Sequence, residues 1–246
     1  MERNLVLLHG FTHTGSTWGP VIRALGERYS PIAPDIRGHG AASEREPVDL
    51  DGVVEDIDQL VEGGRFTLVG YSMGGRIALH AALVLRGRIE RLVLIGASPG
   101  ISDKIEREVR LQADERLARS IEREPSIEKV ARRWEQTPIL EGQPPQVAKF
   151  VHANRLLNTP AGLARALRGL GTGVLPSAWE HLGALEMPVV LIVGERDKKF
   201  GAVADQMEPL LQWCEIVVVP GAGHAVHLED PDAVARVLQK PSLRVV

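Results

Sequence analysis

Sulfur-containing and aromatic side chains are scarce in this chain of 246 residues, which has one cysteine and 4% Phe, Trp and Tyr. Because Cys214 has no second cysteine to pair with, an internal disulfide is excluded, and the thiol fits a buried position in a reducing cytoplasm. The longest apolar runs are of strand length, far below the roughly 20 residues of a membrane-spanning helix. Met1 leads almost directly into a strand, with no signal-type apolar segment. We therefore expect a cytoplasmic protein without a membrane partner.

An excess of charge of one sign is also absent, since 29 Lys and Arg residues face 32 Asp and Glu residues and the net charge is -3. This balance predicts no nucleic-acid partner, because such partners are attracted to strongly basic surfaces. The sequence has no P-loop, no dinucleotide-binding glycine motif after the first strand and no clustered His or Cys ligands. It therefore predicts no metal and no cofactor, and it gives no indication of an oligomeric state.

Strand-like and helix-like segments alternate along the chain, which predicts an α/β protein with a mostly parallel sheet covered on both faces. The expected strands lie near residues 5–8, 29–33, 66–70, 91–96, 188–193 and 215–219, and the expected helices near 17–27, 50–62, 74–86, 202–213 and 231–239. The length suits one such domain with a well-buried core and an insertion.

The alternation stops between residues 99 and 176, where charged, helical sequence replaces the strand patterns. We predict a core formed by residues 1–98 and 177–246, with residues 99–176 inserted as a helical cap after the fourth strand. In the first cap helix, apolar residues recur every four positions, and this stripe is expected to lie against the core or other cap helices. The stripe consists of Ile105, Val109, Ala113, Leu117 and Ile121.

A Gly-x-Ser-x-Gly motif follows the third strand directly, at residues 70–74. A serine at such a sharp strand-to-helix turn forms a nucleophile elbow, which lifts the hydroxyl out of the sheet. The glycines are required because a Cβ beside the serine would collide with the crossing strand and helix. Ser72 is therefore the candidate reactive residue. The next helix directs its N-terminus and the backbone N–H of Met73 at the same point.

An elbow serine needs an acid and a histidine later in the chain, each just after a buried strand. The acid is Asp197, which follows the fifth strand, and Glu195 is its competitor. The histidine is His224, which follows the sixth strand, and His227 is the weaker alternative. Each residue alone has an ordinary structural explanation, but the three in this order predict a Ser-His-Asp triad.

The first strand ends in His-Gly-Phe, and together with the triad this pattern resembles the α/β-hydrolases over nearly the whole chain. The resemblance implies the α/β-hydrolase fold, with about six strands instead of eight because only four residues precede the first strand. In that fold the loop after this strand supplies the second N–H of the oxyanion hole, here from Phe11 beside Met73. We interpret His9 and the glycine-rich loop at residues 35–40 as structural.

Arginine is the abundant cation of the chain, and most arginines fit solvated helix faces. Three positions are candidates for contact with an anionic substrate. Arg76 lies one helical turn after Ser72, although a structural ion pair would also explain it. Arg110 flanks the apolar stripe of the first cap helix, and Arg155 precedes the turn before the last cap helix. A guanidinium group binds a carboxylate at two points, so these residues would suit a substrate with several carboxylates.

Five longer motifs, at residues 70–76, 96–101, 107–118, 134–138 and 194–200, are more specific than the elbow. They resemble the 2-succinyl-6-hydroxy-2,4-cyclohexadiene-1-carboxylate synthases of menaquinone biosynthesis, over roughly residues 5–235. The resemblance implies a carbon–oxygen lyase that eliminates pyruvate from a tricarboxylate, 2-succinyl-5-enolpyruvyl-6-hydroxy-3-cyclohexene-1-carboxylate, without a cofactor. It implies Ser72, Asp197 and His224 as catalytic residues, and it places Tyr71, Arg76, Arg110, Trp134 and Arg155 against the substrate.

Two other interpretations stay open. A carboxylesterase or a C–C bond hydrolase would use the same triad, but a neutral ester would gain nothing from inward-facing arginines, whose desolvation is costly. A catalytically inactive binding protein could also adopt this fold. The complete set of Ser, Asp and His favours an enzyme.

Overall fold

The computed structural model describes residues 3–241, which form one six-stranded parallel sheet with the strand order β2-β1-β3-β4-β5-β6. The strands are β1 (Arg3–Leu8), β2 (Tyr29–Ile32), β3 (Phe66–Tyr71), β4 (Ile89–Ile95), β5 (Val189–Gly194) and β6 (Cys214–Val219). All five neighbouring pairs run in parallel, so the C-terminal ends of the strands meet at one edge of the sheet. The predicted number of strands and their places in the chain are confirmed.

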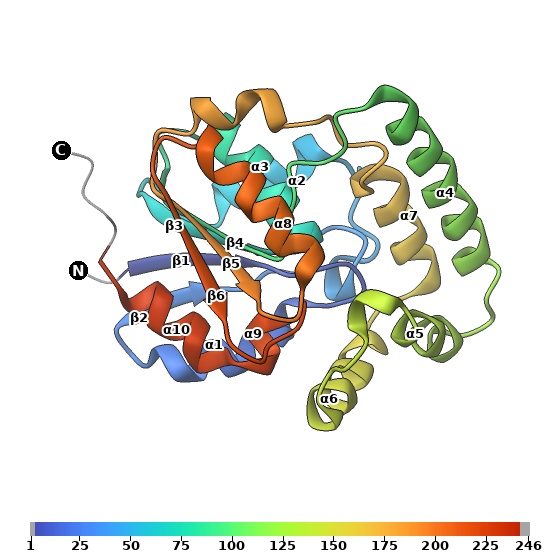
Figure 1. Cartoon of the computed structure of the whole chain (residues 1–246). Coiled ribbons are helices and arrows are strands. Elements are labelled where there is room, and N and C mark those ends of the chain that lie inside the picture. The colour runs from blue at the N-terminus through green and yellow to red at the C-terminus, as the bar shows by residue number, and fades with distance from the viewer. Residues whose placement is uncertain (1–2, 242–246) are drawn as a thin grey trace.

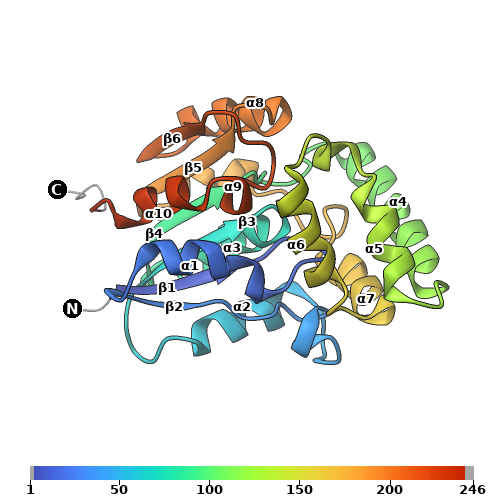
Figure 2. The same ribbon diagram turned by 90° about the horizontal axis from the view of Figure 1, so that it is seen from below.

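Helices cover both faces of the sheet because side chains alternate along each buried strand. In β1, Val6 and Leu8 pack on one face, while Leu5 and Leu7 pack on the other. The first face is covered by α2 (Leu50–Gln59), α3 (Met73–Val84) and α8 (Lys198–Met207). The second is covered by α1 (Gly19–Leu25), α9 (Val226–Glu229) and α10 (Pro231–Gln239), as Figures 1 and 2 show.

Four further helices form a cap at the C-terminal edge of the sheet (Figure 1). They are α4 (Lys104–Glu122), α5 (Ile127–Glu135), α6 (Pro145–Arg155) and α7 (Pro160–Leu170), and along the described chain no strand separates them between β4 and β5. Helix α4 packs on α7, and α5 packs on α6. The predicted insertion after the fourth strand is confirmed, and residues 99 and 176 remain our proposed boundaries for it.

The predicted apolar stripe of α4 is wrong for the first half of the helix. Ile105 and Val109 are 76% and 59% exposed, whereas Asp114, Ala118 and Ile121 are the buried residues of this helix. The reason is geometric: an α-helix has 3.6 residues per turn, so positions spaced by four drift around the axis by about 40° at each step. Over five such positions the stripe turns away from the face of α4 that packs on α7, so its first members are exposed to solvent.

Helix α8 also begins earlier than predicted, at Lys198 instead of residue 202. The carboxylate of Asp197 accepts a hydrogen bond from the backbone N–H of Phe200 at 3.2 Å and so caps the helix. The start of α8 is thereby tied to a residue of the predicted triad. Within residues 3–241, no helix has the length and apolar character needed to cross a membrane.

Candidate active site

Ser72 lies between β3 and α3 with a backbone φ of +53°, in a region that residues with a side chain seldom adopt. The neighbouring glycines permit this turn. A Cβ on Gly70 would lie 2.4 Å from the carbonyl oxygen of Gly74, and one on Gly74 would lie 2.4 Å from the carbonyl oxygen of His9. The strained turn lifts the serine hydroxyl above the edge of the sheet, as an elbow requires.

The three predicted triad residues meet at this edge. His224 Nδ1 lies 2.6 Å from Asp197 Oδ2, and His224 Nε2 lies 3.1 Å from Ser72 Oγ. Asp197 follows β5 and His224 follows β6, and both side chains are buried. With Nδ1 protonated and donating to the carboxylate, Nε2 is left as an acceptor for the serine hydroxyl. The arrangement can therefore withdraw a proton from Ser72.

Neither of the alternative residues reaches Ser72. Glu195 accepts a hydrogen bond from the backbone N–H of Gly221 at 2.8 Å, on the outside of the loop that follows β6. His227 is fully buried, with its ring 4.2 Å from that of Tyr71 and 4.7 Å from that of Trp18, measured between centroids. Burial lowers its pKa to about 3, so the ring is neutral. Geometry thus favours His224 for the contact with Ser72, and Asp197 for the contact with His224.

Two backbone N–H groups beside Ser72 are free to bind an anion. Among the described residues, neither the N–H of Phe11 nor that of Met73 has a hydrogen-bond partner, and both residues line the cavity in front of Ser72. Gly10 allows the Phe11 loop to approach closely, since a Cβ there would lie 2.7 Å from the Tyr71 ring. Met73 is the first residue of α3, whose N-terminus favours negative charge.

His9 and the loop at residues 35–40 have structural partners. The Nε2 of His9 accepts a hydrogen bond from the N–H of Ile36 at 2.9 Å, and burial lowers the pKa of His9 to about 4. The two carboxylate oxygens of Asp35 accept from the N–H groups of Gly15 and Ala41, at 2.7 and 2.8 Å. These bonds join the loops after β1 and β2 and support the Phe11 loop from behind.

A cavity of about 1080 Å³ lies between the triad and the cap. All but one of the residues predicted to bind or transform the substrate line it, namely Phe11, Tyr71, Ser72, Met73, Arg76, Arg110, Trp134, Asp197 and His224. The rings of Phe11 and Trp134 pack edge to face, 4.9 Å apart, and so join the loop after β1 to helix α5 of the cap.

Two arginines on the cavity wall carry charge that the protein does not fully neutralise. Arg76, on α3, is 9% exposed, and its Nε has no hydrogen-bond partner within residues 3–241. Burial, followed by the nearby charge of Arg110, lowers its pKa to about 10, so it stays protonated at neutral pH. Arg110, on α4, donates from Nε to Asp114 Oδ1 at 2.7 Å, and Asp114 is held in turn by the N–H of Gly173.

Arg155 is the predicted residue that does not line the cavity. Its side chain is 1% exposed, with Nε donating to Thr12 Oγ1 at 3.2 Å and Nη1 lying 3.3 Å from Glu135 Oε1. Burial lowers its pKa. Its Nη2 has no hydrogen-bond partner within residues 3–241. The structure nevertheless places Arg155 behind the loop that follows β1, outside the cavity wall, so its position does not support a direct contact with substrate.

The comparisons with known proteins agree with this geometry. The alpha/beta hydrolase family model matches residues 5–237. Relatives from Salmonella paratyphi B and Enterobacter sp., both named 2-succinyl-6-hydroxy-2,4-cyclohexadiene-1-carboxylate synthase, are 34% and 33% identical to the chain. These alignments cover 96% and 95% of this chain, and 94% and 89% of the relatives. The solved structure of MenH from S. aureus has a TM-score of 0.90 at 30% identity, covering 96% of this chain and 91% of that one.

The chain belongs to the 2-succinyl-6-hydroxy-2,4-cyclohexadiene-1-carboxylate synthase family of alpha/beta hydrolases. The predicted family is thus confirmed, together with the predicted fold. In the part of the chain that the structure describes, no three His, Cys, Asp or Glu side chains are grouped as metal ligands would be.

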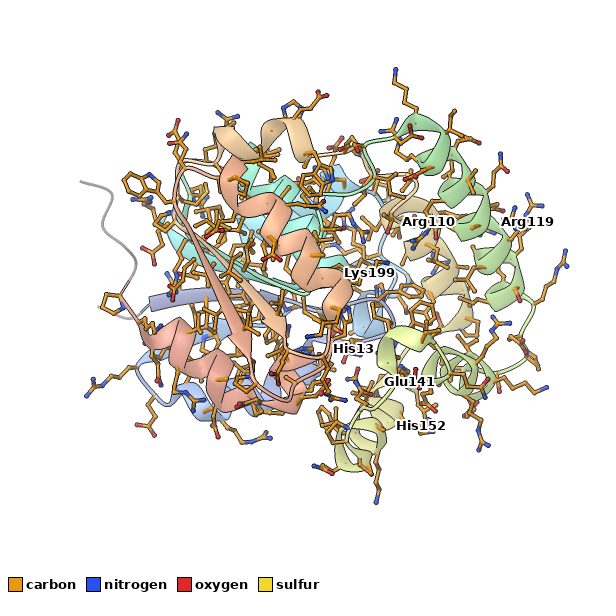
Figure 3. All side chains as sticks on the ribbon, viewed as in Figure 1. His13, Arg110, Arg119, Glu141, His152 and Lys199 are labelled. Atoms are coloured by element: carbon orange, nitrogen blue, oxygen red, sulfur yellow. The ribbon has the colours of Figure 1, made fainter. Side chains whose placement is uncertain are left out.

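Sequence reasoning missed several residues on the cavity wall of this synthase-family protein. His13 lines the cavity and stacks on Tyr71, with ring centroids 5.6 Å apart, and its place two residues after Phe11 could have indicated this. Lys199 also lines it, and in Figure 3 its side chain lies between the core and the cap. Its position two residues after Asp197 was the available signal. Arg196 lines the cavity too, but its donors are taken by Gly142, Gly221 and Glu229.

Proposed function

We propose that the protein eliminates pyruvate from 2-succinyl-5-enolpyruvyl-6-hydroxy-3-cyclohexene-1-carboxylate to give 2-succinyl-6-hydroxy-2,4-cyclohexadiene-1-carboxylate. The observation that carries this proposal is a single cavity that holds a Ser-His-Asp arrangement on the core side and the arginines Arg76 and Arg110 toward the cap. The names of the relatives agree with it. Such a pocket suits a substrate with several carboxylates that undergoes a proton transfer.

The first step is the removal of a carbon-bound proton. Asp197 orients His224 and stabilises its protonated form, and His224 takes the hydroxyl proton of Ser72. Ser72 Oγ in turn takes the proton from the substrate carbon next to the succinyl ketone, which makes that proton acidic. The electron pair moves onto the ketone oxygen. The N–H groups of Phe11 and Met73 are placed to hold this enolate.

The second step breaks the carbon–oxygen bond to the enolpyruvyl group. As the enolate collapses, a double bond forms between ring carbons 2 and 3, and the existing double bond moves from carbons 3 and 4 to carbons 4 and 5. The enolpyruvyl oxygen leaves with the electron pair of its bond to carbon 5. The leaving group gains a proton at its methylene carbon and becomes pyruvate. The proton balance closes because one proton is taken from the ring and one is delivered to the leaving group, so the reaction consumes neither water nor an oxidant.

Substrate binding is assigned to the cavity wall. Arg76 and Arg110 bind carboxylates, and Tyr71 and Trp134 contact the apolar ring. An unneutralised guanidinium group in a largely buried pocket gains most from a carboxylate partner. Arg155 lies outside the cavity wall, so we assign it no substrate carboxylate. Its role is to hold the loop that follows β1.

The reaction takes place in the cytoplasm in this proposal. The support is the small-molecule substrate that the family's name implies, and a single cysteine, Cys214, whose thiol pKa is raised by burial to about 11. A protonated thiol is a poor nucleophile, so Cys214 is expected to stay reduced.

The purified protein should release pyruvate from the enolpyruvyl precursor far faster than it hydrolyses a neutral aryl acetate. The physical reason is that a neutral ester cannot pair with Arg76 and Arg110, whereas a tricarboxylate can. Pyruvate is measured by coupling to lactate dehydrogenase, and ester hydrolysis by release of 4-nitrophenol. Rapid ester turnover without pyruvate would make the protein a carboxylesterase and end this proposal.

Substituting Arg76 by alanine should lower kcat/KM for pyruvate release by about 30-fold or more. Loss of one partner of a buried charge pair costs about 2–5 kcal/mol, and each 1.4 kcal/mol corresponds to about tenfold. Arg110 is 45% exposed and half-paired with Asp114, so we expect only about tenfold from its replacement. Lysine at position 76 should restore activity in part, because it keeps the charge but not the two-point contact.

Arg119 is the matched control for Arg110. Both side chains lie on α4, and each donates from Nε to a carboxylate four residues away at 2.7 Å, to Glu115 in the case of Arg119. In Figure 3, Arg110 lies on the side of α4 that faces the core, whereas Arg119 points away from it. Arg119→Ala should leave kcat/KM within about twofold. If all three alanine variants behave alike, the anionic-substrate assignment is wrong.

A further inference from the structure

The end of cap helix α6 holds the oxyanion loop, which we define as residues 10–14. Three side chains at this end, Asn154, Arg155 and Asn158, are 4%, 1% and 4% exposed. All three form hydrogen bonds with residues in the loops after β1 and β2, which lie more than 110 positions earlier in the sequence. None of the three lines the cavity, so their burial is not explained by contact with a substrate.

The two asparagines bind the backbone of the loop. Asn154 Oδ1 accepts from the N–H of Thr14 at 3.0 Å, and its Nδ2 donates to Thr14 Oγ1 at 2.6 Å. Asn158 Nδ2 donates to the carbonyl oxygen of Thr12 at 2.9 Å, while its Oδ1 accepts from the N–H of Gly40 at 3.1 Å. The cap therefore supplies both donors and acceptors that the loop would otherwise find in water.

Thr12 is the residue that most needs such support. Its φ is +67°, which is unfavourable for a β-branched side chain. It directly follows Phe11, which lines the cavity and whose N–H is one donor of the proposed oxyanion hole. Arg155 binds the Thr12 hydroxyl and Asn158 binds the Thr12 carbonyl, so the strained residue is held on two sides. A strained backbone of this kind persists only where its surroundings determine it.

Arg155 also connects the loop to the wall on the other side of Phe11. Its Nη1 lies 3.3 Å from Glu135 Oε1, and Glu135 follows Trp134, whose ring packs against the Phe11 ring at 4.9 Å. His152 Nδ1 lies 2.7 Å from the same glutamate oxygen. A buried guanidinium group is costly unless it is paired, and within residues 3–241 the Nη2 of Arg155 has no partner. Its place between Thr12 and Glu135 therefore calls for a function.

We propose that Asn154, Arg155 and Asn158 form a clamp that positions the Phe11 N–H, so that the oxyanion hole is complete only when the cap is seated on the core. They act as positioning residues, and Arg155 is not a ligand of a substrate carboxylate. This inference rests on the proposed function in one respect, namely that the Phe11 N–H stabilises the enolate. It departs from the expectation that Arg155 touches the substrate.

A neutral organophosphonate tests the clamp separately from carboxylate binding. In the reaction of ethyl 4-nitrophenyl methylphosphonate, Ser72 Oγ forms a bond to phosphorus, 4-nitrophenolate leaves with the electrons of the broken bond, and His224 takes the serine proton. Negative charge grows on the phosphoryl oxygen in the oxyanion hole, and the probe has no carboxylate. The labelling rate is followed by release of 4-nitrophenolate, and the adduct by intact mass.

We expect Asn158→Ala and Arg155→Met to slow the labelling of Ser72 by about tenfold or more, which is less than the roughly 100-fold to 1000-fold loss that follows complete removal of an oxyanion-hole donor. Asn158→Ala should also lower kcat for pyruvate release while KM stays within about twofold, since the substrate contacts remain. Arg110→Ala is the control, because it should lower kcat/KM for the tricarboxylate and leave the labelling rate unchanged. Asn154→Ala and Asn158→Ala remove only neutral amides. If Arg155→Met does not fold, the labelling rates of these two variants test the clamp.

Wild-type labelling rates in Asn158→Ala and Arg155→Met would overturn the clamp. A raised KM in Arg155→Met with unchanged labelling would also overturn it, and would make Arg155 a carboxylate ligand instead. Failure of the proposed function has a different signature. In that case the wild-type protein releases no pyruvate, while the labelling of Ser72 still depends on Asn158 and Arg155.

Discussion

Substituting Ser72 or His224 by alanine should lower the rate of pyruvate release by roughly four to six orders of magnitude. The two residues act as one unit, because His224 Nε2 lies 3.1 Å from Ser72 Oγ. Without His224 the serine cannot give up its proton, and without Ser72 the histidine has no group through which to act on the substrate. The double variant should therefore be hardly slower than either single one, since effects within a triad are far from additive. Single-turnover assays with excess enzyme give the rate of the chemical step.

The fold must survive these substitutions for the loss to be assigned to chemistry. An alanine at position 72 keeps the φ of +53° and removes one hydroxyl, so its thermal midpoint should stay close to that of the wild type. Circular dichroism and thermal melts of both variants provide the check. A well-folded variant with near-normal turnover would remove the triad from the mechanism.

The sheet could be predicted because its strands are buried on both faces. In β3 and β5 every residue is buried, which leaves a largely apolar run in the sequence, and helices of the core carry caps such as Asp49 and Asp230. Local signals of this kind need no knowledge of distant contacts. The predicted triad was accessible for the same reason, since each of its members lies just past the C-terminal end of a strand.

The cap was harder to predict because its helices are polar and pack on one another. The buried face of α4 includes Asp114, an acidic residue at a position where an apolar one would be expected. Its carboxylate binds Arg110 and the N–H of Gly173. Meanwhile Ile105 and Val109 are exposed on the same helix. Apolar spacing alone therefore identified the helix but not its buried face.

The position of Arg155 could not be read from the sequence for a different reason. Its partner Thr12 lies 143 residues away, and its hydrogen bond depends on how the cap is seated on the core. Sequence motifs indicate that an arginine is present near the site, but they do not distinguish the wall of a cavity from the layer behind it. Arg76 was easier to place because one helical turn joins it to Ser72.

Asp197→Asn should lower pyruvate release by roughly three to four orders of magnitude, whereas Glu195→Gln should change it by less than about threefold. In the wild type, Asp197 Oδ2 lies 2.6 Å from His224 Nδ1, so the carboxylate fixes the tautomer with its acceptor nitrogen toward Ser72 and stabilises the charge that develops on the ring. An amide can donate to Nδ1 and thereby hold the wrong tautomer, with the N–H at Nε2.

The Glu195→Gln variant is the matched control, since it makes the same chemical change two residues earlier. Glu195 Oε2 accepts from the N–H of Gly221 on the outer side of the loop, and a glutamine oxygen can accept the same bond. Both variants keep side-chain volume. Asn at position 197 can also still accept the N–H of Phe200 that caps α8, so its fold should be retained. Steady-state kinetics of the two proteins decide the matter: a larger loss in Glu195→Gln would transfer the role of the acid to Glu195.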